Sequence, residues 1–184
     1  AIITNVIKTC GVARAAKFLD DIKDLGYYRA FKGGLSFNLN DILIPEERKD
    51  QIAQGNAIVD DLYANYTMGL ITDDERYRKT VDTWKEIDEK LKKIVMKHME
   101  EADEGFNSVY MMMDSGARGN DSQLRQLAGM RGLIANTAGK TIEVPIKANY
   151  REGLNISEYF ISSRGARKGL ADTALRTADS GYLT

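Results

Sequence analysis

Basic side chains surround a row of very small residues, and the row beside it, in the C-terminal stretch 155–184. Residues four apart share a face of a helix, and one such row is made of Gly165, Gly169, Thr173, Thr177 and Gly181. The row beside it contains Ala166, Leu170, Ala174, Ala178 and Tyr182. Arg164, Arg167, Lys168 and Arg176 add positive charge around both rows. A glycine inside a helix costs about 1 kcal/mol relative to alanine. The bare face therefore predicts a close neighbour, which is either another helix or a bulky surface such as stacked nucleic-acid bases.

A second basic group lies upstream, where Arg118, Arg125 and Arg131 alternate with glycines. Glycine permits close approach to the backbone, and arginine offers a planar fork of donors to a phosphate. The alternative interpretation is structural: these arginines would cap helices or form ion pairs in the loops with Asp114 and Asp121. The residues alone favour the structural interpretation.

Candidate metal ligands are few and poorly spaced. His98 and Glu101 would share one side of a helix, but two ligands do not make a site, so we interpret His98 as a packing residue at the end of an apolar stripe. Asp60–Asp61 and Asp73–Asp74 are adjacent carboxylates rather than spaced chelating groups. The sequence predicts no metal site and no cofactor in this stretch.

Composition bounds the class of protein. The 184 residues are 43% hydrophobic and 29% charged with a net charge of −1, which is typical of a globular chain without a global basic field. The single cysteine, Cys10, cannot form an internal disulfide and is predicted to be a small buried side chain in a reducing compartment. No leader or long apolar run is evident, which favours a cytoplasmic protein with no membrane contact. The chain starts without Met and stops inside a helical pattern, so we interpret it as a piece of a longer protein.

The N-terminal pattern predicts a short helix over residues 1–10, a break at Cys10–Gly11, and an amphipathic helix that ends at Gly33–Gly34. One face of that helix carries Val12, Ala15, Ala16, Leu19 and Ile22.

Residues 46–102 are predicted to form a long antiparallel helical hairpin that starts after Pro45. Its first apolar stripe contains Ile52, Gly55, Val59, Leu62 and Tyr66. Its second stripe contains Tyr77, Val81, Trp84, Ile87, Leu91, Ile94 and His98. Gly69–Thr72 makes the turn, and Thr72 with Glu75 has the form of a capping box. The charged outer faces are typical of a solvated surface.

The remaining elements complete a mainly α fold. Residues 141–146 alternate like a strand and, with 147–150, predict a small β-hairpin. Asn155 with Glu158 forms another capping box. No proline follows Ile156, so a long helix of about 43 Å is expected to run to the chain end, where it is cut off.

Several long motifs resemble one protein family. Glu158–Ile161 and Gly165–Thr184 are similar to the bridge helix of the bacterial RNA polymerase beta-prime subunit. Phe106–Gly119 and Gln123–Gly132 resemble the segment that precedes this helix, including its F-loop, and Ala148–Leu154 resembles the join. Residues 1–105 fit the family's funnel region by the order of their helices. The resemblance thus implies two domains, 1–105 with the hairpin 46–102, and 106–184 with the F-loop and bridge-helix segment.

The resemblance implies a role in transcription as part of a DNA-directed RNA polymerase, a nucleotidyltransferase that uses two magnesium ions. The magnesium-binding aspartates of the family are absent here, so no catalytic residue and no metal is expected in this stretch. The residues matching positions near the template and nucleic acid are Arg167, Lys168, Thr173, Arg176, Thr177, Ala178 and Tyr182. Arg118, Arg125 and Arg131 match the F-loop on the nucleotide side, and Gly165 and Gly169 match the hinge of the bridge helix.

The implied partners are the other polymerase subunits, the DNA template, RNA, nucleoside triphosphates, and transcription factors that dock on the hairpin at the rim of the secondary channel. The implied location is the bacterial cytoplasm, in association with the nucleoid. Two other functions remain open from the residues: a non-catalytic helical docking module for transcription factors, and a stand-alone nucleic-acid-binding helical domain.

Overall fold

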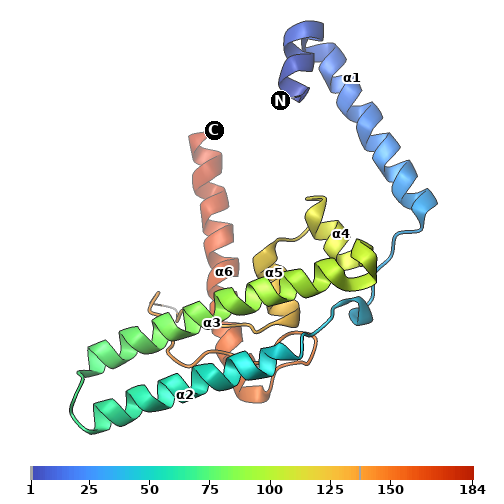
Figure 1. Ribbon diagram of the computed structural model, residues 1–184. Coiled ribbons are helices and arrows are strands. Elements are labelled where there is room, and N and C mark those ends of the chain that lie inside the picture. Colours follow the sequence, from blue (N-terminus) through green and yellow to red (C-terminus); the bar gives the residue numbers. More distant parts are fainter. Residues whose placement is uncertain (1, 137) are drawn as a thin grey trace. The chain divides into compact units, whose positions relative to one another are not determined.

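The computed structural model describes residues 2–136 and 138–184, and within them the regular structure is helical (Figure 1). The α-helices are α1 (Ile2–Gly33), α2 (Glu47–Thr67), α3 (Asp73–Glu101), α4 (Ser108–Asp114), α5 (Asp121–Ala128) and α6 (Ile156–Leu183). Two short 3-10 helices are η1 (Leu39–Asp41) and η2 (Ala102–Gly105). The chain forms two compact units, of which one ends at Phe37 and the other is Asn38–Thr184. The predicted mainly α fold with a helical hairpin and a long C-terminal helix is confirmed.

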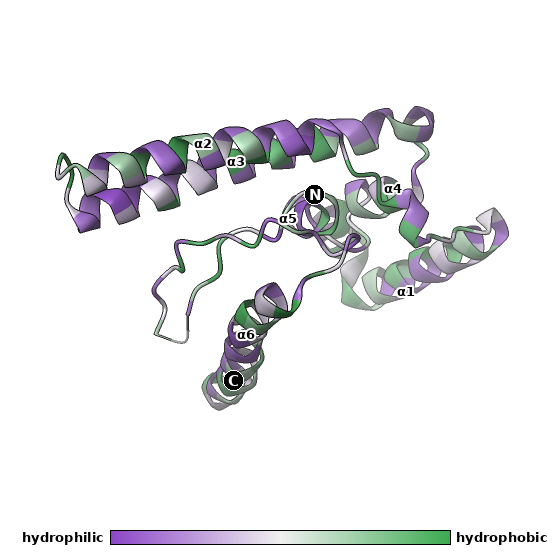
Figure 2. Ribbon diagram, turned by 90° about the horizontal axis from the view of Figure 1, so that it is seen from below, coloured by the Kyte–Doolittle hydropathy of each residue, from purple (hydrophilic) through white to green (hydrophobic). Residues whose placement is uncertain are grey.

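Helix α1 makes up most of the first unit and breaks where the sequence predicts. Gly11 has φ 78 and ψ 168, a conformation that favours glycine, so it kinks the helix. Ala15 is the one buried residue described in α1, and the rest of its expected apolar face is exposed. Figure 2 shows hydrophobic residues along α1. Cys10 is also exposed, so its predicted burial is wrong, because no other helix of this unit packs against it.

The hairpin of α2 and α3 forms the centre of the second unit, and both views show the two helices side by side (Figures 1 and 2). Gly69 has φ 74 in the turn, and the Thr72 side chain accepts a hydrogen bond from the Glu75 amide at 3.3 Å, so Thr72 is the N-cap of α3. The Glu75 carboxylate pairs with Lys79 at 2.8 Å and does not complete the predicted capping box. Trp84 is only 2% exposed and packs with Ile87, Leu91 and Met130. A Cβ atom at Gly55 would lie 2.9 Å from the Trp84 ring, so glycine makes the room for this indole.

The buried face of α3 turns along its length. Successive buried residues Ile87, Leu91, Val95 and Met99 are four apart, and each such step rotates the face by about 40°. Ile87 and Leu91 thus face the α2 side, whereas Val95 and Met99 join a second core cluster with Ile42, Val109, Leu124 and Ala128. His98 falls off this rotating face and is exposed, so its predicted packing role is wrong.

The outer side of the hairpin is solvated, as predicted. Ion pairs between exposed side chains four apart join Lys90 to Glu86 at 2.8 Å and Lys97 to Glu101 at 3.7 Å. Such exposed pairs stabilise a helix by only a few tenths of a kcal/mol. The helices described here are too polar or too short to be membrane spans.

The connection between α3 and α4 is strained. Asp103 and Glu104 have φ values of 50 and 56, in the left-handed region that a side chain disfavours by about 1–2 kcal/mol. We expect Glu104→Gly to raise the free energy of unfolding by about 0.5–1 kcal/mol, because glycine adopts this conformation without that cost. Urea unfolding followed by the fluorescence of Trp84 measures the change. The control is Glu100→Gly in α3, which should lower the free energy of unfolding by about 1 kcal/mol. Destabilisation by both variants would contradict the expectation.

The described residues between α5 and α6, 129–136 and 138–155, contain no helix or continuous strand, and the small β-hairpin predicted within 141–150 does not form. Instead Gly132 pairs with Ile146 and Ala135 with Thr141 as isolated antiparallel bridges. The two bridges are in different registers, and Pro145 has no N–H to donate between them, so no continuous ladder develops. The alternating stretch therefore finds its partner upstream, at 132–135.

Candidate functional site

Helix α6, which carries most of the predicted site residues, starts at a complete capping box. The Asn155 side chain accepts a hydrogen bond from the Glu158 amide at 2.8 Å, and the Asn155 amide donates to the Glu158 carboxylate at 3.1 Å. These bonds satisfy donors that a helix start leaves without partners. The predicted start of the long helix is thus confirmed.

The predicted nucleic-acid-facing residues of α6 are exposed along one stretch of the helix. Exposed side chains include Arg167, Thr173, Arg176, Thr177, Ala178 and Tyr182, whereas Lys168 is half-buried. Tyr182 is 93% exposed. The Thr173 hydroxyl donates to the Gly169 carbonyl and the Thr177 hydroxyl to the Thr173 carbonyl, each at 2.8 Å. Both hydroxyls are thereby bonded to the backbone of their own helix.

The glycines of the small-residue row do not share one environment. A Cβ atom at Gly165 would lie 2.8 Å from Cγ2 of Ile134, whereas one at Gly169 or Gly181 would meet nothing within 4 Å. Close packing therefore accounts for Gly165 only. The open side of the row begins at Gly169, and the hinge role of Gly165 and Gly169 stays a prediction.

Arg131 joins the loop after α5 to the first turns of α6. Its Nε donates to the Ser162 hydroxyl at 3.1 Å, and another guanidinium nitrogen donates to the Gln126 side chain. The same guanidinium lies 4.9 Å from the centre of the Tyr150 ring. Ser162 is the one buried residue described in α6, so Arg131 serves to attach the helix and not to meet a phosphate freely.

Arg125 is likewise used inside the fold. It forms an ion pair with Asp88 of α3, and both side chains are largely buried. Burial, and to a smaller extent the nearby Arg131, lower the pKa of Arg125, and the Asp88 carboxylate is the opposite charge that it meets. A Cβ atom at Gly132, whose φ is 84, would lie 3.3 Å from the Asp88 carboxylate. Neither of the predicted partners Asp114 or Asp121 pairs with Arg125; Asp121 lies instead 3.9 Å from Lys92.

Arg118 differs from the other two arginines of its group. Its side chain is exposed, and within residues 2–136 and 138–184 no hydrogen bond or ion pair holds its guanidinium. It lies at an apolar cavity of about 370 Å³ whose lining includes Met112, Met113, Leu127 and Tyr150. The same lack of a described partner applies to Arg167 and Arg176 on α6. These three arginines are available for an anionic partner.

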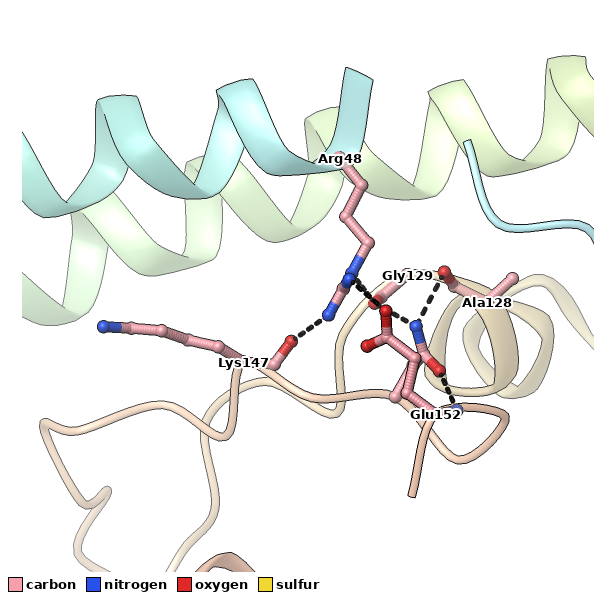
Figure 3. A network of polar contacts seen from close by, with 6 residues as sticks. Arg48, Ala128, Gly129, Lys147 and Glu152 are labelled. Atoms are coloured by element: carbon pink, nitrogen blue, oxygen red, sulfur yellow. Dashed lines mark hydrogen bonds and ion pairs between the residues drawn. The ribbon is translucent and has the colours of Figure 1, made fainter. Parts of the chain in front are cut away.

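The sequence reasoning did not identify Arg48, which joins three segments of the second unit by hydrogen bonds. Arg48 lies in the first turn of α2 and is 7% exposed. Its Nε donates to the Gly129 carbonyl at 2.6 Å, and its two terminal nitrogens donate to the Lys147 carbonyl at 2.7 Å and the Glu152 carboxylate at 2.9 Å (Figure 3). A cation in the first turn of a helix opposes the helix dipole. That unfavourable position was the available signal that Arg48 has a partner elsewhere.

Asn149 completes this network from the side of the loop. It is 0% exposed, and its amide nitrogen donates to the Ala128 and Gly129 carbonyls at 3.2 and 3.3 Å. Its side-chain oxygen accepts from the Glu152 amide at 2.8 Å. The Gly129 carbonyl therefore accepts from both Arg48 and Asn149, and three distant segments of the chain meet at one atom.

In the part of the chain that the structure describes, no group of three or more His, Cys, Asp or Glu side chains could hold a metal ion. His98 and Glu101 are both exposed near the end of α3. Among the described residues, Glu101 pairs with Lys97 and with no other cation.

Comparisons with known proteins give consistent matches. Residues 71–159 match the family described as RNA polymerase Rpb1, domain 4, and residues 153–184 match RNA polymerase Rpb1, domain 5. The whole chain is 58% identical to the DNA-directed RNA polymerase subunit beta' of Parabacteroides distasonis and also 58% identical to that of Porphyromonas cangingivalis. It is 56% identical to the corresponding subunit of Flavobacterium psychrophilum. The chain spans 13%, 16% and 13% of the length of these three relatives.

Proposed function

Because this chain belongs to the Rpb1 and beta-prime family of RNA polymerase subunits and matches an internal stretch of them, we propose that it forms one wall of the polymerase active centre. In this proposal α6 is the bridge helix, and it lies beside the template and the site of nucleotide addition. The magnesium ions that drive phosphoryl transfer are bound elsewhere in the enzyme. The chain thus supplies shape and positive charge, and no reacting group.

The observation that carries the proposal is the open face of α6. From Gly169 onward the small-residue row is exposed, a Cβ atom at Gly169 or Gly181 would meet nothing within 4 Å, and the two threonine hydroxyls in the row are already bonded to their own helix. A face of small, exposed residues leaves room for a base pair, since stacking requires area and no hydrogen bonds. Arg167 and Arg176, for which the described residues offer no partner, lie on the same helix and can meet the phosphates of a nucleic-acid strand.

The segment between α4 and α6, which contains α5, is proposed to support this helix on the nucleotide side. Arg118, whose guanidinium has no partner in the described residues, is the residue of this loop suited to contact an incoming triphosphate. Arg125 and Arg131 contribute by holding the loop against α3 and α6. Gly165 and Gly169 are proposed to let the helix bend as the nucleic acid advances.

Other polymerase subunits and the rest of beta-prime are proposed to cover the exposed apolar side chains of α1. Val12, Leu19, Ile22, Leu25 and Phe31 are between 42% and 79% exposed. Apolar patches of this extent on a protein surface are normally interfaces. A cytoplasmic location follows from the proposed role.

The test is RNA extension by a polymerase assembled from segments of the beta-prime subunit. One reaction contains the beta-prime segments that flank this chain, the partner subunits, template, primer and nucleoside triphosphates, and a second reaction also contains this chain. Extension that requires the chain supports the proposal. Extension of equal rate without it would contradict a place in the active centre.

A docking role for the hairpin is the second candidate, and the hairpin turn favours it. Met68 and Leu70 are 72% and 69% exposed at this turn, where a helical transcription factor could contact them. Tight binding of such a factor by the chain, without any effect on extension, would favour docking as the main function. Salt-dependent DNA binding by the chain alone would instead favour a stand-alone nucleic-acid binder.

A further inference from the structure

We infer that Arg48 is a positioning residue for α6: it fixes the loop from which α6 starts to the base of the α2/α3 hairpin. This inference rests on the proposed function, since the effect on nucleotide addition requires α6 to be part of the active centre. Arg48 itself touches neither α6 nor any residue assigned to the nucleic-acid face.

Arg48 joins several distant segments of the chain. It belongs to the first turn of α2, and its three acceptors belong to the end of α5 and to two points of the loop 147–152. These segments are far apart in sequence, by 81 to 104 residues from Arg48. Each of the three guanidinium nitrogens donates to a different acceptor, so three of the five N–H groups of the side chain are held (Figure 3).

Only a few residues of the chain separate this network from α6. Glu152 is followed three residues later by Asn155, the residue that caps α6. The backbone of the loop is also attached to α5, by the Tyr150 amide bonded to the Gln126 carbonyl at 3.1 Å and the Arg151 amide bonded to the Leu127 carbonyl at 3.3 Å. The start of α6 therefore has little freedom as long as Arg48 holds the loop and α5 to the hairpin.

Removal of the Arg48 guanidinium would free the loop from the hairpin. The Gly129 and Lys147 carbonyls would each lose a charged donor. Asn149 still donates to the Gly129 carbonyl, but its amide is bonded to Ala128 and Gly129 and not to Lys147. The loop would then shift relative to the hairpin, and the start of α6 with it. A misplacement of about 1 Å at a distance from the chemistry can slow a reaction by about 100-fold, so a smaller shift predicts a measurable loss.

The experiment uses assembled polymerase with full-length beta-prime and measures single-nucleotide addition over a range of nucleoside triphosphate concentrations. Arg48→Met keeps the aliphatic stem and removes the donors, and we expect it to lower the maximum rate by about tenfold with less than a twofold change in the half-saturating triphosphate concentration. Arg48→Lys keeps the charge and three donors and should stay within about threefold of the original rate. Glu152→Gln, which removes one charge of the network at its exposed end, should give a small loss in the same direction.

Lys49→Met is the matched control, because Lys49 is exposed on the same turn and has no described side-chain partner. Subunit copurification and the thermal midpoint of each assembled enzyme separate misplacement from failure to fold. An assembled, equally stable Arg48→Met enzyme with the original maximum rate would overturn the inference. So would a loss that excess triphosphate restores. Ala178→Leu is measured in the same assay. If Ala178→Leu is slow and Arg48→Met is not, only the positioning inference fails. Normal rates for both variants would reject the proposed function.

Discussion

Ala178→Leu in the full polymerase is expected to slow nucleotide addition by about 100-fold or more. Ala178 is exposed on α6, one residue from Thr177, whose hydroxyl is bonded to the Thr173 carbonyl. The leucine side chain would project into the space that the proposal assigns to the template base. The rate constant for a single addition at saturating triphosphate measures the loss.

Ala178→Ser is the control for this prediction. Serine is close in size to alanine, and its hydroxyl can bond to the carbonyl four residues earlier, as Thr173 and Thr177 do. We expect a rate within a few-fold of the original. A fast Ala178→Leu enzyme would show that no ligand lies against this face, and an equally slow Ala178→Ser enzyme would show that side-chain size is not the cause.

Gly129→Ala is expected to lower the free energy of unfolding of the chain by about 3 kcal/mol. A Cβ atom at this buried position would lie 2.8 Å from the Arg125 carbonyl oxygen, 3.4 Å from the Arg125 side chain and 3.5 Å from Val95. The first of these atoms belongs to the backbone of α5 and cannot turn aside. Relief would require a shift of Gly129 itself, whose carbonyl accepts hydrogen bonds from Arg48 and Asn149. Urea unfolding followed by the buried Trp84 measures the loss.

Gly169→Ala provides the matched control with the opposite sign. Gly169 lies within α6, and a Cβ atom there meets nothing within 4 Å. Alanine should therefore raise helix stability by about 1 kcal/mol through its better helix propensity. Because Trp84 is not in α6, this gain is best measured by circular dichroism of the helix signal. Equal effects of the two substitutions would show that the close contact at Gly129 does not decide stability.

The predictions that held rest on local physics. The N-cap at Thr72, the capping box at Asn155, the kink at Gly11 and the turn at Gly69 each depend on a few neighbouring residues. The apolar stripes of the hairpin also followed from periodicity, up to Leu91. Beyond it the buried face turned towards Val95 and Met99, because α3 leaves α2 there and packs against other elements.

The family resemblance was likewise present in the sequence, because it is carried by ordered runs of residues such as Gly165–Thr184. Sequence matching could indicate which helix bears the open face. It could not tell a glycine with a close neighbour, Gly165, from one without, Gly169, since both occupy the same row.

Tertiary structure decided where the charged side chains went. Arg125 found Asp88 on another helix, Arg131 found Ser162 and Gln126, and Arg48 found three acceptors from 81 to 104 residues away. A long side chain can reach partners in many directions, and no spacing rule along the chain specifies which. Burial makes an unpaired charge costly, so the fold as a whole selects the partners. The sequence by itself thus determined α1 with its kink, the α2/α3 hairpin, the start of α6 and the family, whereas the joint between hairpin, loop and α6 exists only once the segments are packed together.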